Sequence, residues 1–349
     1  MWSPRLRTRA AALAVLSLVA FPRLASAADP APSGLFNRPF YIGAYLGEAD
    51  SRTERVEQGI GRFAQMVGKR PAIVKTFHNL DVDFSAGGWA GQLVRRTSAA
   101  GSMPYLALDL RFAGAPRHGL LDAINSGHAD AQLVRMARGL AGVRGTVMVS
   151  PGWEMNGRWD FAWQGVYNGN QAAPAKYAAA FRRMVTIFRR EGARNVKWVF
   201  SPNVGNPLAL GSVGPSHWNW YGHYYPGDAY VDYLGPHGYN GPSVWGGAYQ
   251  TFATVFTGRD SDNILTDLER RFPRKPIIIG EFATQEARGY DKGAWIREAF
   301  ATLRRHPNVV GAIWFHTRKE ADWRIDSSRS SLDAFRTVMR DPNVRTSFR

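Results

Sequence analysis

Hydrophobic positions recur along the chain with two alternating periods. Short runs rich in β-branched and aromatic residues predict strands, and longer segments with an apolar residue every three or four positions predict helices. Thr53–Val67 carries its apolar residues on one face at this helical spacing, and Pro174–Arg190 repeats the pattern. The chain therefore reads as a regular alternation of strand and helix.

Eight strands are predicted, at Phe40–Leu46, Ala72–Phe77, Met103–Leu110, Thr146–Ser150, Val196–Ser201, Asp232–Tyr239, Pro276–Glu281 and Val309–Phe315. Further helices are predicted near Ala129–Leu140, Asp262–Phe272, Ala294–Arg305 and Ser331–Arg340. Strands joined by helical crossovers form a parallel sheet, and eight such strands can close into a (β/α)8 TIM barrel. No linker or low-complexity stretch interrupts residues 28–349, so we expect this segment to be a single α/β domain.

The first 27 residues have the layout of a secretory signal peptide. Arg5, Arg7 and Arg9 form a basic region, Ala10–Phe21 is a short apolar run, and Ala25-Ser26-Ala27 is a small-residue cleavage signal. We expect cleavage after Ala27 and a secreted or periplasmic domain of residues 28–349 without a membrane anchor. The alternative is a short N-terminal helix buried in the fold.

The composition and motifs of the chain exclude several classes of catalytic and binding site. The 349 residues are 45% hydrophobic and include no cysteine, which excludes disulfide scaffolds, thiolate metal sites and thiol nucleophiles. No His-Glu-x-x-His spacing, phosphate-binding glycine loop, dinucleotide fingerprint or Gly-x-Ser-x-Gly elbow is present. We therefore expect neither a metal nor a cofactor.

The chain is strongly basic. Its 44 Lys and Arg against 28 Asp and Glu give a net charge of +16, and loss of the four arginines in residues 1–27 would leave +12. The arginines are scattered over predicted helices, which is typical of a solvated surface, although attraction to an acidic polysaccharide is an alternative. Export argues against nucleic acid as a partner, and we expect a monomer.

Three glutamates lie at or just beyond the carboxyl ends of predicted strands, where the active sites of (β/α)8 barrels are built: Glu48, Glu154 and Glu281. An apolar strand that ends in a carboxylate is costly unless the acid has a partner or a task. Strands four and seven lie nearly opposite in a barrel, so Glu154 and Glu281 can reach one cavity. Two facing carboxylates are the groups that glycoside hydrolysis requires, and the alternative is a pair of structural ion-pair partners.

Aromatic residues gather near the same strand ends. Trp153, Trp159, Phe161 and Trp163 follow the fourth strand, and a second group before and on the sixth strand comprises Trp218, Trp220, Tyr221, Tyr224, Tyr225 and Tyr239. Trp314 lies on the last strand. Singly, such residues usually fill a core. Together at one rim they favour binding of sugar rings, so a polysaccharide is the expected partner.

Four motifs give the chain a resemblance to glycoside hydrolase family 26, a family of (β/α)8 retaining enzymes that contains the β-mannanases. They are Trp153-Glu154-Met155-Asn156-Gly157, Tyr224-Tyr225-Pro226-Gly227-Asp228-Ala229-Tyr230-Val231-Asp232, Gly238-Tyr239-Asn240 and Ile279-Gly280-Glu281-Phe282. The resemblance implies that Glu154 is the acid/base and Glu281 the nucleophile. It also implies that Tyr239 hydrogen-bonds the nucleophile and that Trp314 stacks beneath the sugar. Ser201-Pro202-Asn203 resembles the family's fifth-strand ending, so Asn203 is a candidate substrate contact.

Two positions depart from the family pattern. Trp153 stands where the family usually has His, and His237 stands where it usually has Asp. The resemblance implies a retaining endo-β-glycosidase acting on a β-mannan-like polysaccharide, and the signal peptide implies that it is exported. The two departures leave β-1,3-xylan, mixed-linkage β-glucan and bacterial exopolysaccharides open. His78, His237 and His316 lie near strand ends and are candidates for the cleft wall. The alternative function is a carbohydrate-binding barrel that has lost catalysis.

Overall fold

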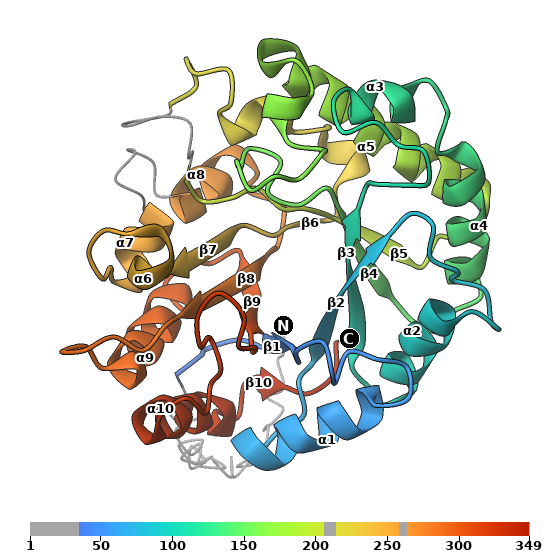
Figure 1. Cartoon of the computed structure of the whole chain (residues 1–349). Coiled ribbons are helices and arrows are strands. Elements are labelled where there is room, and N and C mark those ends of the chain that lie inside the picture. Colours follow the sequence, from blue (N-terminus) through green and yellow to red (C-terminus); the bar gives the residue numbers. More distant parts are fainter. Residues whose placement is uncertain (1–34, 206–213, 258–263, 349) are drawn as a thin grey trace, which may run out of the picture. The chain divides into compact units, whose positions relative to one another are not determined.

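The computed structural model describes residues 35–205, 214–257 and 264–348, which form a closed (β/α)8 barrel (Figure 1). The predicted fold class is therefore confirmed. The predicted signal peptide lies outside the described residues. Within the described part of the chain, no helix has both the length and the apolar character needed to cross a bilayer.

The barrel wall consists of parallel strands in sequence order. The strands are β1 (Phe40–Tyr45), β2 (Ile73–Asn79), β3 (Met103–Asp109), β4 (Val147–Pro151), β5 (Val196–Phe200), β6 (Tyr233–Leu234), β7 (His237–Asn240), β8 (Ile277–Thr284) and β9 (Val309–Phe315). Strand β9 pairs with both β8 and β1, which closes the barrel. A short β10 (Val344–Arg345) adds to the start of β1.

The sixth position in the wall holds two short strands, where one continuous strand over Asp232–Tyr239 is predicted. Strands β6 and β7 both pair with β8, and Gly235 and Pro236 lie between them. Proline has no N–H to donate to a ladder, so the strand is interrupted there. The break begins a new strand at His237, at the carboxyl end of the barrel.

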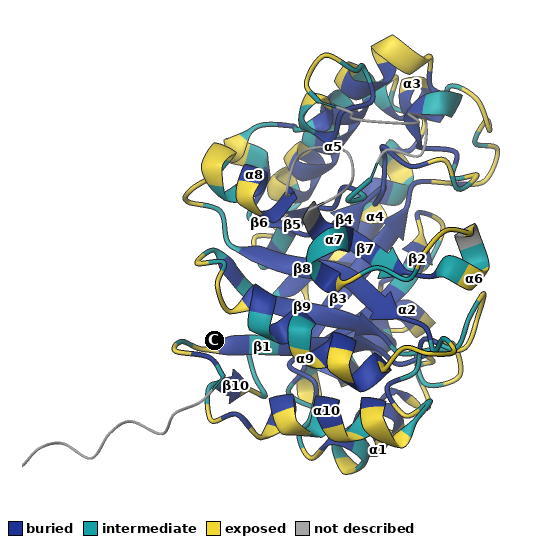
Figure 2. Cartoon of the chain, turned by 90° about the vertical axis from the view of Figure 1, so that its left-hand side faces the viewer, coloured by how far each residue is buried: buried dark blue, intermediate teal, exposed yellow. Residues whose placement is uncertain are grey.

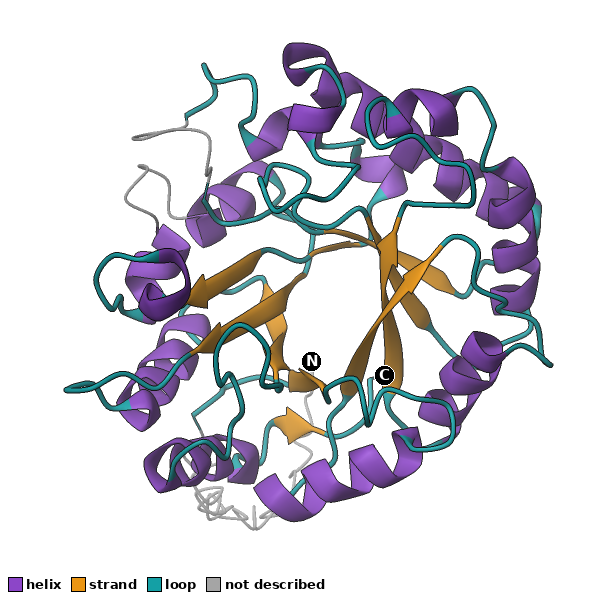
Figure 3. Cartoon of the chain, viewed as in Figure 1, coloured by secondary structure: helices purple, strands orange, loops and turns teal. Residues whose placement is uncertain are grey.

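Helices cover the outside of the sheet (Figure 3). They are α1 (Val56–Val67), α2 (Trp89–Ala99), α3 (Leu120–Asn125), α4 (Asp130–Ala141), α5 (Ala173–Arg190), α6 (Pro242–Trp245), α7 (Phe252–Thr257), α8 (Ile264–Arg271), α9 (Lys292–Leu303) and α10 (Arg329–Arg340). The predicted helices agree to within a few residues, except that positions 262 and 263 of the helix predicted at Asp262–Phe272 lie outside the described residues. The helical period places Val56, Ile60, Phe63 and Val67 of α1 in the core, as expected from their spacing.

The core has two layers. A large layer fills the space between sheet and helices, and a smaller cluster lies among inward-facing strand residues that include Ile73, Met103, Tyr105, Met148 and Ile313. Figure 2 shows the strands mostly buried and the helices with both buried and exposed residues. Tyr105 and the apolar groups around it fill part of the barrel interior, which leaves the carboxyl ends of the strands free to form a pocket.

Candidate active site

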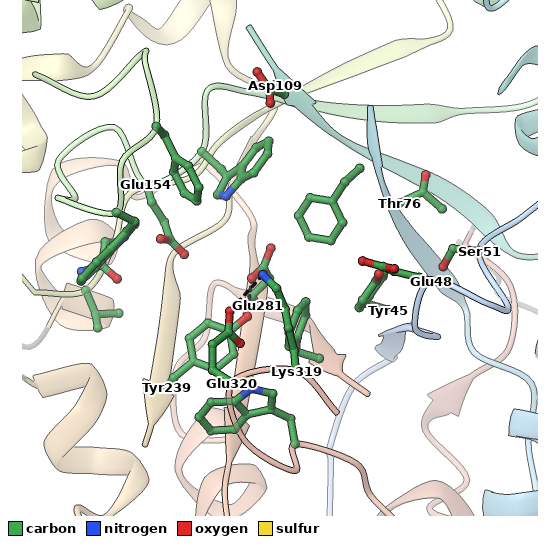
Figure 4. A pocket seen from close by; sticks show the side chains of 18 of the residues that line it. Tyr45, Glu48, Ser51, Thr76, Asp109, Glu154, Tyr239, Glu281, Lys319 and Glu320 are labelled. Atoms are coloured by element: carbon green, nitrogen blue, oxygen red, sulfur yellow. Dashed lines mark hydrogen bonds and ion pairs between the residues drawn. The ribbon is translucent and has the colours of Figure 1, made fainter. Parts of the chain in front are cut away.

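A pocket of about 980 Å³ opens at the carboxyl ends of the strands. Its wall carries ten aromatic side chains: Tyr45, Phe77, Trp89, Trp153, Trp159, Phe161, Trp163, Tyr239, Phe315 and Trp323. Glu154 and Glu281 both line it (Figure 4). Figure 4 also shows Tyr45, Glu48 and Ser51 on the side of Glu281 away from Glu154. The pocket therefore extends past the carboxylate pair toward β1.

Glu154 is held by an unusual backbone turn. Strand β4 ends at Pro151, and Gly152 and Glu154 then take left-handed conformations with φ of 55° and 52°. A left-handed glutamate is strained and persists where its surroundings fix it. Here its N–H donates to the Ser201 carbonyl at 2.7 Å, and the Gln164 amide donates to its own carbonyl at 3.1 Å. These bonds hold the acid at the pocket floor.

Glu281 lies within β8 at an irregularity of the ladder. The register between β8 and β9 shifts between Ile279 and Phe282, so two residues of β8 occupy the space of one on β9. Such bulges re-aim side chains near active sites. Glu281 is 4% exposed, accepts a hydrogen bond from the Tyr239 hydroxyl at Oε2, and forms an ion pair with Lys75 through Oε1 at 2.6 Å. The predicted contact between Tyr239 and Glu281 is thus present.

The two carboxylates are close enough to influence each other strongly. One oxygen of Glu154, one of Glu281 and a ring nitrogen of His237 lie within 4.8 Å of one another. Burial, followed by repulsion from Glu281, raises the pKa of Glu154 to about 8, and the Lys75 charge opposes the rise. Glu154 therefore carries a proton at neutral pH beside an ion-paired Glu281. The two acids are prepared for different roles.

These three residues are also the set whose donor atoms could surround a metal ion. The Lys75 ammonium already lies against Glu281 at 2.6 Å and would repel a second cation at this position. The positive charge of the site is thus supplied by a side chain.

His237 does not line the pocket wall, contrary to the sequence prediction that it contacts substrate. It is fully buried, with Nδ1 at 2.9 Å from Glu154 Oε1 and Nε2 at 3.3 Å from Lys75 Nζ. Burial and the Lys75 charge lower its pKa well below the ordinary value, so the ring is neutral. His237 is the first residue of β7, and its ring lies between Glu154 and Lys75.

The other two candidate histidines, His78 and His316, differ in their position relative to the pocket. His78 lines the pocket, with Nε2 at 2.9 Å from the Thr76 hydroxyl and its ring beside Trp89. Burial lowers its pKa to about 4. His316 is not part of the wall, because its Nδ1 accepts the Ile325 N–H at 3.0 Å behind the barrel rim.

The predicted aromatic contacts after β4 and the fifth-strand Asn203 lie at the pocket. Trp153 and Trp159 contribute to the wall, whereas Trp163 is 1% exposed and mainly supports the loop by donating Nε1–H to the Trp153 carbonyl at 2.8 Å. Asn203 also lines the pocket, and its backbone N–H donates to Asn156 Oδ1 at 2.8 Å.

The prediction that Trp314 stacks beneath the sugar is wrong. Trp314 is fully buried between the sheet and the helices, edge-on to Phe282 and Phe335, and it does not line the pocket. Its neighbour Phe315 faces the pocket instead, because successive side chains of a strand point to opposite faces. Trp314 donates Nε1–H to the Trp323 carbonyl at 2.8 Å, so it supports the loop whose Trp323 lines the pocket next to Tyr239.

Sequence reasoning missed Lys75, Trp89 and Trp323. Lys75 interrupts the apolar strand Ile73-Val74-Lys75-Thr76-Phe77, and a buried charge in such a run is the same signal that identified Glu281. Trp89 is 52% exposed at the start of α2 and lines the pocket, but no pattern of its own marks it in the sequence.

The chain is similar in sequence and in fold to known glycoside hydrolases. Residues 128–287 match the family described as Glycosyl hydrolase family 26. Endoglucanase H of Acetivibrio thermocellus is 37% identical over 309 residues, which cover 88% of this chain and 31% of that protein. The chain thus spans about a third of the length of this relative.

Solved structures share the fold. GH26C from Muricauda sp. MAR_2010_75 superposes with a TM-score of 0.64 at 17% identity, covering 89% of this chain and 88% of that one. The catalytic domain of the Bacillus sp. JAMB-750 GH26 endo-β-1,4-mannanase gives 0.63 at 18% identity, covering 88% and 87%.

Replacing Trp314 by Phe tests its reassignment to the core. We expect the free energy of unfolding in urea to fall by about 1–3 kcal/mol, because a cavity forms and the bond to Trp323 is lost. KM should stay close to the wild-type value. A KM that rises tenfold without loss of stability would restore Trp314 as a sugar contact.

Replacing Glu154 by Gln tests its role as the acid. Its pKa of about 8 predicts that kcat/KM of the wild type falls as pH rises through 8, because the proton to be donated is lost. In Glu154→Gln the rate should drop by about 10²–10⁴-fold and this basic limb should disappear from the pH profile. Persistence of the limb in the variant would assign it to another group.

Proposed function

We propose that this chain, whose residues 128–287 match glycoside hydrolase family 26, is an exported, retaining endo-β-glycosidase that cleaves a neutral β-glucan. The observation that carries the proposal is the carboxylate pair at the floor of an aromatic pocket. Glu154 is protonated and Glu281 is ion-paired, with their nearest oxygens within 4.8 Å. Acid and nucleophile are the two roles that glycoside cleavage assigns to such a pair.

The first step forms a glycosyl-enzyme. Glu281 attacks the anomeric carbon while the bond from that carbon to the glycosidic oxygen breaks, and Glu154 donates its proton to the departing oxygen. Tyr239 holds Oε2 of Glu281 and Lys75 holds Oε1, so the nucleophile is fixed before substrate arrives. Orienting a nucleophile in advance removes an entropic cost from the barrier.

The second step releases the sugar. Glu154, now ionised, removes a proton from water, and the water oxygen displaces Glu281 from the anomeric carbon. Retaining pairs lie about 5–5.5 Å apart, whereas inverting pairs need about 6.5–9.5 Å to hold a water between them. The short separation of Glu154 and Glu281 supports the retaining route.

The charges of the pocket support a neutral glycan. Besides the protonated Glu154, the wall carries four carboxylates from Glu48, Asp109, Glu281 and Glu320, against three cations from Arg52, Arg111 and Lys319. The basic excess of the chain is therefore not concentrated in the pocket, and an acidic polysaccharide has less support than the net charge alone suggests. The relative named endoglucanase favours glucan among the neutral candidates. A β-mannan is the second candidate, through the sequence resemblance to a family that contains β-mannanases.

Internal cleavage is supported by the extent of the wall. Lining residues continue on both sides of the carboxylates, from Ser51 and Arg52 after β1 to Thr254 and Val255 in α7. Sugars can therefore be held on either side of the broken bond. The predicted signal peptide is consistent with a polymeric substrate outside the cytoplasm.

The proposal is tested by reducing-end release from the chain beginning at Ala28. Mixed-linkage β-glucan, carboxymethylcellulose, β-mannan, β-1,3-xylan and acidic exopolysaccharides form the panel, with Glu281→Ala as the matched control. We expect release from β-glucan that falls to background in the control, because the nucleophile is absent.

Other outcomes are equally informative. Release from mannan alone would replace the glucan assignment. Binding of a panel glycan in affinity electrophoresis, with no release and no effect of Glu281→Ala, would instead support a carbohydrate-binding barrel without catalysis.

A further inference from the structure

A buried lysine lies beneath both carboxylates. Lys75, on β2, is fully buried, and its Nζ lies 2.6 Å from Glu281 Oε1, 3.0 Å from the Gly280 carbonyl oxygen and 3.3 Å from His237 Nε2. The ring of Tyr105 faces the same ammonium at 4.8 Å. A buried cation is tolerated when it is paired and hydrogen-bonded, and Lys75 is ion-paired with Glu281 and hydrogen-bonded to Gly280 and His237.

The N–H donors of Lys75 determine which ring nitrogen of His237 carries the proton. A protonated lysine has three N–H donors and no acceptor, and three groups surround Nζ: a carboxylate oxygen, a carbonyl oxygen and Nε2 of His237. Nε2 must therefore accept. In a neutral ring the proton then lies on Nδ1, which donates to Glu154 Oε1 at 2.9 Å.

We propose that Lys75 and His237 act as a positioning relay for the glycosidase reaction, in which Lys75 fixes the Nδ1–H tautomer of His237 and His237 in turn orients Glu154. The inference rests on the proposed function. Because Oε1 of Glu154 accepts the His237 N–H, the proton that Glu154 donates resides on Oε2. The relay thereby selects which oxygen of the acid carries the transferable proton.

The net charge of the two acids stays constant through the reaction, and Lys75 can balance it in both states. Before cleavage, Lys75 balances the negative charge of Glu281. When Glu281 becomes an ester, that charge disappears and Glu154, having given up its proton, carries one in its place. The Lys75 charge lowers the pKa of Glu154, so the same cation favours the ionised base in the second step. One buried cation thus serves two carboxylates in turn.

The direct test is nitrogen NMR of the chain from Ala28 labelled with ¹⁵N-histidine, with the His237 resonances assigned by their absence in His237→Asn. The groups that face the His237 ring are Lys75 from β2, Glu154 from the loop after β4 and Glu281 from β8. We expect a neutral Nδ1–H ring that does not titrate between pH 5 and 8, because burial and Lys75 hold its pKa low. An Nε2–H tautomer or an imidazolium in the wild type would overturn the relay.

Lys75→Met removes the cation that fixes the tautomer. We expect the His237 ring to gain a proton at higher pH than in the wild type, because the Lys75 charge no longer opposes it. A folded Lys75→Met variant whose His237 signals match the wild type would contradict the proposal. The wild-type spectrum alone decides the tautomer if this variant does not fold.

Two amide replacements separate the ends of the relay. Asn places an N–H where Nδ1 lies and can still donate to Glu154, whereas Gln places its amide near Nε2 and keeps only the Lys75 contact. For substrates with a poor leaving group, we expect kcat of His237→Gln to be at least about 10-fold lower than kcat of His237→Asn. This loss is smaller than the roughly 10⁴-fold loss of kcat that a wrong histidine tautomer causes in serine proteases. An aryl glycoside with an activated leaving group should show little difference, since it needs no protonation.

Equal losses in both variants on both substrates would indicate a purely structural histidine. A wild type that hydrolyses no glycan but shows the predicted tautomer would refute the proposed function and leave the Lys75–His237 contact intact. Hydrolysis together with the opposite tautomer would refute the relay alone.

Discussion

The floor of the pocket is organised around one buried positive charge. Lys75 lies within 3.3 Å of Glu281 and His237, and His237 lies within 2.9 Å of Glu154. Two carboxylates this close cannot both ionise cheaply in a buried site. A single cation satisfies one negative charge, so one acid is ionised and the other keeps its proton. That asymmetry is the chemical requirement for an acid and a nucleophile to work as a pair.

The barrel supplies this arrangement from three distant parts of the chain. Strands β2, β4 and β8 bring Lys75, Glu154 and Glu281 together, and the regular ladder gives way to irregular backbone at the functional positions. Glu154 has a positive φ, the β8–β9 register shifts around Glu281, and Pro236 breaks the strand before His237. Strain at these points is held in place by a well-packed sheet elsewhere.

Much of this could be predicted from the sequence, because apolar periodicity locates strands and helices, and acids at strand ends stand out against apolar runs. Glu154 and Glu281 were identified in that way. Trp314 was misplaced because β9 is apolar on both faces, and alternation alone does not tell which face points inward. Lys75 was missed although it interrupts β2 as conspicuously as Glu281 ends its own strand. The sequence predicts His237 in the pocket wall because the hydrophobic pattern gives no sign that the sixth strand is split into β6 and β7.

The central claim is that Glu154 and Glu281 act by double displacement. The most direct measurement is proton NMR of the first reducing-end anomer formed from a β-glucan oligosaccharide, recorded before mutarotation equilibrates the product. The account predicts that the β-anomer appears first, because two inversions at the anomeric carbon restore its configuration. An α-anomer formed first would mean that water attacks directly, and Glu281 would not be a nucleophile.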